Sequence, residues 1–426
     1  MHNKQPPIDN LAVMRRSSID EKNPLDTKNP EVHSNDRIFT IFQELRLKGP
    51  VVWNPEVNER GFWSVIGRNE IVEVYKKPEI FSASWQNGGF RMFDTDKVTN
   101  TPNRAFFALD PPERTDIRRA ISKWFTPLMV AQNIPTIRQR AERLIEAIAK
   151  KGKADFVAEV SFPYSMGLAT DLMGLEESFG PTLGRWIEVL LADDDPDVMT
   201  TLDVRQQAIS EFDEWALEIF EGRFRPNTDL LDVLRRVSIG GNKLNFDDFS
   251  VNVLGLVAAF SETTRHALSY AILALDADPL GRARLIADPS LASVSAKEII
   301  RWASPTSHFR RTAMRDVELG GAQIRKGDKV VLWLTAANRD STQWDCPDQV
   351  NLTRFAGDVP AHVSFGAGPS FCLGWRYAEL ELSIMLETLA RRLPDIRQAG
   401  SELRLKSNFV RAIRSLPVEF TPSLAG

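Results

Sequence analysis

The pattern of apolar and polar positions predicts a mainly helical chain with a few short strands. From Pro111 to about residue 300 the apolar residues recur at helical spacing. Short β-like runs occur at residues 51–53, 62–66, 316–324 and 329–333. The pattern therefore predicts an α+β chain that is mainly α and carries small β-sheets.

One predicted helix stands out by its length. Asn245 can cap it, and Asp247 and Asp248 suit the positive end of its dipole. Pro279 ends it, so the helix would be about 50 Å long at ~1.5 Å per residue. Its first half is apolar on all sides, which predicts a central, buried helix. A last amphipathic helix is predicted from Cys372 to Leu393.

The chain is predicted to form one domain. Residues 1–36 are polar, with scattered Pro and Asn, and are expected to be a flexible leader. Residues 37–426 contain neither repeats nor a linker rich in Pro, Gly or Ser, and are expected to form a single catalytic domain. Residues 82–107 predict a long loop of the kind that often carries function.

Composition excludes several classes of protein. Apolar residues make up 43% and charged residues 26%, as in ordinary soluble proteins. The formal charge of −4 argues against a dedicated nucleic-acid binder. Two cysteines and five scattered histidines exclude a disulfide scaffold and a zinc site of familiar spacing. Because there is neither a signal peptide nor an apolar run of about 20 residues, we expect a cytoplasmic protein without a membrane anchor.

The densest chemical pattern surrounds Cys372. A thiol at the start of a helix lies near free backbone N–H groups, which favour the thiolate. Gly366 would let the preceding loop turn tightly, and Phe365 would keep water from the sulfur. Such a thiolate is a suitable axial ligand for haem iron. A structural cysteine in a Gly-rich turn, or a nucleophilic cysteine paired with His362, are the two other interpretations.

The spacing F-x-x-G-x-x-x-C-x-G is more specific than either alternative. It is met by Phe365, Gly368, Cys372 and Gly374. With this segment the chain resembles the cytochrome P-450 family of haem-thiolate proteins, from about residue 37 to residue 422. The resemblance implies a haem b (iron protoporphyrin IX) held between the long central helix and the cysteine loop, with Cys372 as the iron ligand.

Other landmarks of the family follow in the same order. Glu298 and Arg301 form an E-x-x-R pair on one helix face, and the resemblance implies that Arg354 joins them in a structural triad. Arg114 and Arg118 share another helix face, so two fixed cations could bind two carboxylates.

The resemblance implies further haem contacts. They are Ala259, Arg311, His362, Phe365, Gly366 and Gly374, together with Arg114 and Arg118. Ser370 departs from the pattern, because many relatives carry histidine or arginine there.

A polar break in the central helix is the candidate catalytic segment. The resemblance implies that Glu262 and Thr263 lie over the iron, organise water and relay protons to dioxygen. Phe260 departs from the pattern, because the family usually has glycine at this position. Its ring would either point away from the iron or narrow the pocket above it.

The function implied by the resemblance is insertion of one oxygen atom of O2 into a lipophilic molecule of terpenoid, sterol or fatty-acyl type. Predicted substrate contacts are Trp85, Phe90, Met92, Phe93, Phe260, Ser307, Phe309 and Phe409. The alternatives are a haem-thiolate enzyme that uses peroxide or performs no oxygenation, and a haem-binding protein without turnover.

Electrons must come from outside the chain, which lacks flavin and iron–sulfur motifs. The predicted partners are a ferredoxin and its NAD(P)H-dependent reductase, with the enzyme itself a monomer. The expected docking face gathers Arg114, Arg118, Arg119, Lys123 and Arg376.

Overall fold

The structure is a computed structural model. It describes residues 23–423 except residues 24, 57–59, 94–103, 192–194, 196–197 and 199–200. The predicted loop 82–107 therefore lies partly outside the described residues.

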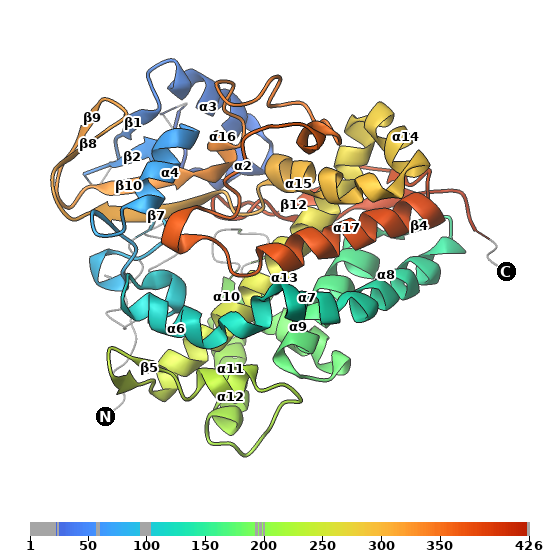
Figure 1. Ribbon diagram of the computed structural model, residues 1–426, viewed down its shortest axis with the longest axis horizontal. Coiled ribbons are helices and arrows are strands. Elements are labelled where there is room, and N and C mark those ends of the chain that lie inside the picture. Colours follow the sequence, from blue (N-terminus) through green and yellow to red (C-terminus); the bar gives the residue numbers. More distant parts are fainter. Residues whose placement is uncertain are drawn as a thin grey trace.

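Helices make up most of the described chain (Figure 1). They are α2 (Pro30–Ser34), α3 (Arg37–Arg46), α4 (Arg68–Lys76), α6 (Glu113–Ile121), α7 (Pro127–Gln132), α8 (Ile134–Ala149), α9 (Phe162–Met173), α10 (Gly180–Leu191), α11 (Leu202–Phe220), α12 (Leu230–Leu234), α13 (Phe246–Ala277), α14 (Pro279–Ala287), α15 (Ala292–Ala303), α16 (Leu334–Ala337) and α17 (Trp375–Arg392).

Within the described ranges the strands are short and form one larger sheet and four small ones. They are β1 (Val51–Asn54), β2 (Phe62–Val65), β3 (Phe81–Ser82), β4 (Lys153–Asp155), β5 (Ser238–Ile239), β6 (Asn242–Lys243), β7 (His308–Ala313), β8 (Val317–Leu319), β9 (Ala322–Ile324), β10 (Lys329–Trp333), β11 (Arg397–Gln398), β12 (Leu403–Arg404), β13 (Ile413–Ser415) and β14 (Pro417–Glu419).

The main sheet has the order β1-β2-β10-β7-β3. The two runs predicted as strands at residues 51–53 and 62–66 form β1 and β2, which pair antiparallel with Val51 opposite Val65. β10 lies parallel to β2 and antiparallel to β7. All five residues of β10 are buried, because the sheet is covered on both faces. In Figure 1 this region occupies the upper left, with α3, α4 and α16 around it.

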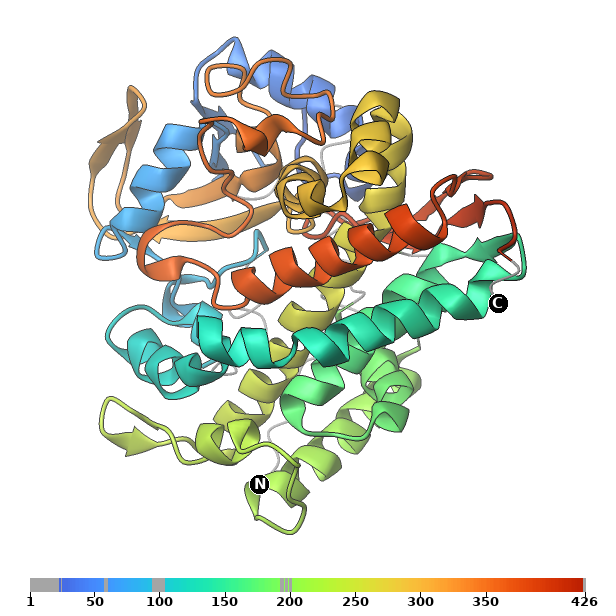
Figure 2. The same cartoon turned by 45° about the vertical axis from the view of Figure 1, so that its right-hand side comes forward.

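The long helix α13 runs through the helical region, and both cartoons show α17 crossing beside it (Figures 1 and 2). Asn245 caps it as predicted, its side chain accepting from the backbone N–H of Asp248 at 2.8 Å. The helix ends before Asp278, whose carboxylate accepts from Gly281 N at 2.8 Å and starts α14. The length and both ends of this helix were predictable because each end carries its own capping residue.

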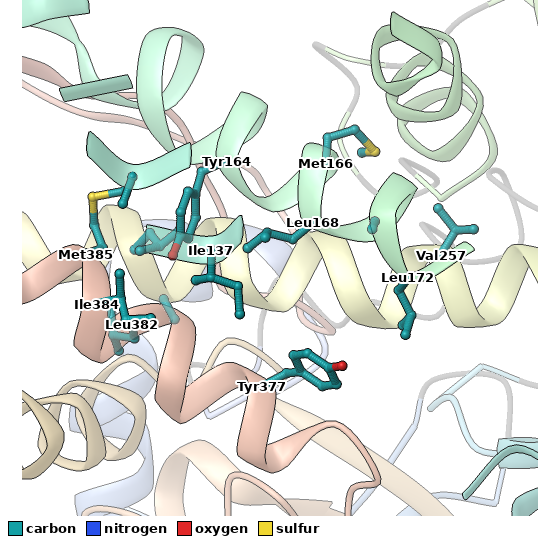
Figure 3. Close-up of a cluster of buried hydrophobic side chains, with 14 of the residues drawn as sticks. Ile137, Tyr164, Met166, Leu168, Leu172, Val257, Tyr377, Leu382, Ile384 and Met385 are labelled. Carbon is teal, nitrogen blue, oxygen red and sulfur yellow. The ribbon is translucent and has the colours of Figure 1, made fainter. Parts of the chain in front are cut away.

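A hydrophobic core joins α8, α9, α13 and α17. Figure 3 shows the side chains that meet there, among them Ile137, Tyr164, Met166, Leu168, Leu172, Val257, Leu382, Ile384 and Met385. Burial of each such side chain is worth roughly 1.5–3 kcal/mol, so this cluster fixes α17 against its neighbours. The helix that follows the cysteine is therefore a rigid platform.

Two predicted boundaries need correction. The last helix begins at Trp375 rather than Cys372, which still belongs to the loop and donates its backbone N–H to Phe365 O at 2.8 Å. The expected leader is not loose over residues 25–36. Lys28 is fully buried beside Glu56, and His33 is stacked on Trp333 with its ring centroid 5.4 Å away.

Within the described ranges, no helix combines the length and the apolar character that crossing a bilayer requires.

Candidate active site

The cysteine loop, residues 365–374, is shaped by two glycines with positive φ. Gly366 has φ +70° and Gly368 has φ +56°, conformations that residues with a Cβ rarely adopt. A Cβ at Gly368 would lie 3.1 Å from Tyr75 O, so the loop presses against the end of α4. The backbone of this loop therefore fixes the position of Cys372 just before the first residue of α17.

The thiol of Cys372 faces the surface on one side and the start of α17 on the other. The backbone N–H groups of Gly374 and Trp375 donate to the sulfur, as the sequence predicted for a helix start. Burial nevertheless raises the pKa of the thiol above its usual value, and these N–H groups and Arg118 offset only part of that effect. The backbone N–H groups thus act in the expected direction, but the net shift of the thiol pKa is upward.

Three arginines gather beside the cysteine loop. Burial, together with the charges of Arg311 and Arg118, lowers the pKa of Arg114 to about 10. Arg118 Nη2 donates to Phe371 O at 2.7 Å, which ties α6 to the cysteine loop. Arg311 lies 5.1 Å over the ring of Tyr75. The nearby carboxylate of Asp110 is already engaged with Ser82 and Ala83 N.

Buried donors in this region lack partners among the described residues. They are Arg114 Nη2, Tyr75 Oη and His362 Nδ1. Since an unpaired buried donor costs about 1–3 kcal/mol, such a group implies an acceptor that binds there. Two carboxylates would satisfy the arginines, and an iron would complete the thiolate site. The residues present therefore fit a haem with two propionates.

His362 does not form a catalytic dyad with the cysteine. Its Nδ1 has no partner among the described residues, and its ring packs between Phe355 and Phe365 at centroid distances of 5.9 and 5.2 Å. Burial lowers its pKa to about 3, with the charge of Arg301 contributing, so it is neutral at pH 7. A nucleophilic Cys372 would need His362 as its general base, so this interpretation is not supported.

Arg114 should affect haem binding and apoprotein stability in opposite directions. We expect Arg114→Leu to weaken haem binding by about 10–100-fold, as for groups that orient a cofactor. The same change should leave the haem-free protein equally or more stable, because it removes a buried, unpaired cation. Haem transfer to apomyoglobin and chemical unfolding measure the two effects. Arg119→Leu on the exposed face of α6 is the control. Equal destabilisation of both forms would contradict the assignment.

The predicted triad forms as expected. Glu298 and Arg301 are completely buried and bonded at 2.7 and 2.8 Å, and Arg354 Nε lies 3.1 Å from both Glu298 oxygens. Arg301 also donates to Asn338 O and Pro347 O. Together these ion pairs and hydrogen bonds hold residues 338–354 against α15. This segment precedes the cysteine loop in the chain.

Glu262 and Thr263, the two candidate catalytic residues in the polar segment of α13, have different surroundings. Thr263 is half-buried, and its hydroxyl donates to Ala259 O at 2.9 Å. Glu262 is paired with Arg265 at 2.6 Å and lies 3.4 Å from His266 Nε2. Burial alone would raise the pKa of Glu262, but Arg265 and His266 outweigh it and lower that pKa. The carboxylate is therefore ionised.

The prediction that Phe260 contacts substrate is corrected. Its ring packs edge-on against Tyr377 of α17, with centroids 5.3 Å apart, and it lines a separate cavity behind α13. Residue 260 lies about 100° from residue 259 but only about 60° from residue 263 around α13. Helix spacing therefore does not separate the ring from Thr263, and it is the contact with Tyr377 that places the ring against α17.

Three of the predicted substrate contacts, which are phenylalanines from distant segments, lie against one another. The ring of Phe90 lies 6.3 Å from Phe309 and 6.0 Å from Phe409, and Phe107 joins at 4.7 Å. Two backbone bonds fix this arrangement: Arg310 N donates to Phe90 O at 2.7 Å, and Ser307 N to Phe409 O at 2.8 Å.

The remaining predicted contacts lie around this aromatic cluster. Ser307 and Met92 are fully buried, Phe93 is half-buried, and Trp85 packs against the larger core from a one-turn helix at Trp85–Asn87. Their contact with a substrate stays a prediction.

Sequence reasoning missed two residues. Tyr75 brings an unpartnered, buried hydroxyl to the arginine cluster, and nothing in its local pattern marks it. Glu381 is 1% exposed, and it lies three residues after Ala378 and four before Met385, on the apolar face of α17. That polar residue in an apolar stripe was a signal that could have been found.

Comparisons with known proteins agree with this site. The family model for cytochrome P450 matches residues 290–397, which contain the triad and the cysteine loop. Linalool 8-monooxygenase of Pseudomonas putida is 34% identical over 404 residues, covering 93% of this chain and 99% of that protein. Steroid C26-monooxygenase of Rhodococcus jostii is 30% identical, covering 94% and 86%.

Solved structures show the same fold. Cytochrome P450-153 from Novosphingobium aromaticivorans has a TM-score of 0.81 at 31% identity, covering 93% of this chain and 99% of that chain. A Mycobacterium marinum cytochrome P450 in complex with pseudoionone also has a TM-score of 0.81 at 31% identity, covering 91% and 95%.

The fold and these comparisons together define a haem-thiolate enzyme that uses haem b. The chain belongs to the cytochrome P450 family, and it is a cytochrome P450 monooxygenase.

Proposed function

We propose that this enzyme inserts one oxygen atom of O2 into a lipophilic molecule of terpenoid, sterol or fatty-acyl type, with electrons from a separate ferredoxin. The aromatic cluster of Phe90, Phe107, Phe309 and Phe409 carries the proposal, since such a wall excludes water and binds hydrocarbon. The similarity to proteins named for linalool and steroids supports the same class of substrate.

The residues of this chain would have separate roles in the reaction. Haem, when bound through Cys372, supplies the activation of dioxygen. Arg114, Arg118 and Arg311 would hold its propionates. The phenylalanines orient the substrate, and Thr263 holds a proton at Oγ1 that it shares with Ala259 O. Glu262 would exchange protons with water, and Arg265 fixes its carboxylate.

The proposed ferredoxin would dock on the cysteine side. Arg376 lies 4.3 Å over the ring of Trp375, and Arg119 is exposed on α6, while the nearby Lys123 is paired with Asp229 at 2.7 Å. A basic rim of this kind steers an acidic partner. Arg114 is only 4% exposed, so it is removed from the predicted docking residues and kept as a haem contact.

Reconstitution tests this function. Holoenzyme with a ferredoxin, its reductase and NAD(P)H is offered a monoterpene alcohol, a sterol and a branched fatty acid. A shift of the Soret band would report binding, and mass spectrometry would report a product with one added oxygen. Turnover with peroxide but none with any ferredoxin would contradict the electron source.

Thr263→Ala should uncouple electron use from product formation. We expect the product formed per NAD(P)H to fall on the order of tenfold, because positioned proton transfer contributes ~10²–10⁴-fold in enzymes. Ser261→Ala is the matched control, since Ser261 makes the same type of bond to Val257 O at 2.8 Å on the buried side of α13. Unchanged coupling in the Thr263 variant would remove this residue from the mechanism.

A further inference from the structure

A cavity of about 380 Å³ lies behind α13, apart from the residues assigned to haem. Its walls come from α7, α8, α9, α13 and α17 and from the loop at residues 227–229. Figure 3 shows Ile137, Leu172 and Tyr377 facing one another at this place. Its volume falls in the range of small-molecule pockets, roughly 300–1,000 Å³.

The walls combine aromatic rings with carboxyl groups. Trp124, Phe260 and Tyr377 supply the rings, while Asp171 and Glu381 lie on opposite helices. Asp229 is a third acid, and neither Lys, Arg nor His lines the cavity within the described part of the chain. The described lining therefore offers acidic groups and aromatic rings but no basic group of its own.

Two of these acids are neutralised from outside the cavity. Asp171 forms a two-bond pair with Arg140, and Asp229 pairs with Lys123 at 2.7 Å. Glu381 differs, because it is 1% exposed and its Oε1 has no hydrogen-bond partner among the residues that the structure describes. Thr264 donates to the same carboxyl group, so only one side of it is satisfied. An unsatisfied acceptor in a cavity wall points to a ligand that supplies the missing charge or donor.

The pKa of Glu381 and the groups around it are consistent with an unsatisfied carboxyl group in the cavity wall. Burial raises the pKa of Glu381 to about 8, against the smaller lowering effects of Thr264 and Arg140, and Asp171 raises it further. Tyr164 donates to the backbone carbonyl of Glu381 at 3.1 Å, and Tyr377 accepts from Asn133 at 2.9 Å. A cation beside Glu381 would restore the ionised carboxylate.

We propose that this cavity is a second ligand site, separate from the haem, for a small organic ammonium ion with an apolar body. The aromatic faces of Phe260, Tyr377 and Trp124 would attract the cation, and Glu381 would be its counter-ion. The phenylalanine that replaces the family's usual glycine thereby becomes a wall of this site. This inference goes beyond the proposed function and does not depend on it.

Calorimetric titration of the holoenzyme tests the proposal. The probe is benzyltrimethylammonium, which cannot coordinate iron, and the neutral control is the isosteric hydrocarbon neopentylbenzene. We expect one equivalent of the cation to bind without change in the Soret band, at least about tenfold tighter than the hydrocarbon, since a desolvated cation–π contact is worth about 2 kcal/mol.

Variants separate this site from others. Glu381→Gln should weaken binding of the cation about tenfold, and Phe260→Leu should weaken it several-fold, while both keep the Soret spectrum and melting temperature of a folded holoenzyme. Glu379→Gln, two positions away on α17, is the control and should bind as the wild type does. No binding, equal binding of both probes, a Soret shift, or an unaffected Glu381→Gln variant would overturn the proposal. Each readout is independent of turnover.

Discussion

Cys372→Ser is expected to lower monooxygenase activity by more than about a thousandfold, which corresponds to roughly 4 kcal/mol of barrier. Cys372 is the residue whose sulfur faces the arginine cluster and accepts N–H groups from the start of α17. Serine can occupy the same place, but a hydroxyl does not supply the electron-rich sulfur that favours O–O cleavage. The ferrous carbonyl form should therefore lose the red-shifted Soret band of sulfur ligation.

The other cysteine provides the control for this prediction. Cys346 is exposed and lies in a turn with φ +44°, next to the triad rather than the haem site. Cys346→Ser should keep both the carbonyl spectrum and the activity. A Cys372→Ser enzyme with the wild-type carbonyl band would show that the iron ligand lies elsewhere.

Glu298→Gln is expected to destabilise the protein by about 3–5 kcal/mol, the typical cost of breaking a buried ion pair. Glu298 is completely buried between Arg301 and Arg354, so its loss leaves two guanidinium groups without their shared counter-ion. The segment 338–354 should loosen from α15, and the cysteine loop beyond it would lose its support. Denaturant unfolding of holoenzyme, followed by circular dichroism and by the Soret band, measures the effect.

An exposed ion pair on α4 provides the control for the stability effect of Glu298→Gln. Glu73 and Lys77 are paired at 2.6 Å along α4, with both side chains 41% exposed. Glu73→Gln should change the free energy of unfolding by less than about 0.5 kcal/mol. If Glu298→Gln changed it by as little, the triad would not be a structural support of the loop.

Features with local causes were predictable from the sequence. The central helix carries its cap at Asn245 and its terminator at Pro279, so both ends are encoded within a few residues. The cysteine loop could be located because glycines at positive φ leave a spacing pattern. The E-x-x-R pair was visible because helix geometry places residues three apart together.

Other features depend on which elements meet. The direction of the Phe260 ring follows from the position of Tyr377, more than a hundred residues later in the chain. The raised pKa of the Cys372 thiol reflects the surrounding packing, which outweighs the local N–H groups. Residues 25–36 of the expected leader are held in place by distant parts of the chain, because His33 stacks on Trp333 and Lys28 pairs with Glu56.

The sequence by itself located the cysteine loop, the long helix and the E-x-x-R pair, because each is a short-range pattern of turning, capping or helical spacing. The roles of Cys372 and Arg354 were predicted only through the resemblance to cytochrome P-450 proteins. Only the tertiary structure decided that three phenylalanines from distant segments meet, and that a buried glutamate lines a second cavity. Charge repulsion, ring packing and desolvation act between side chains that are close in space, and one-dimensional spacing carries no record of that proximity.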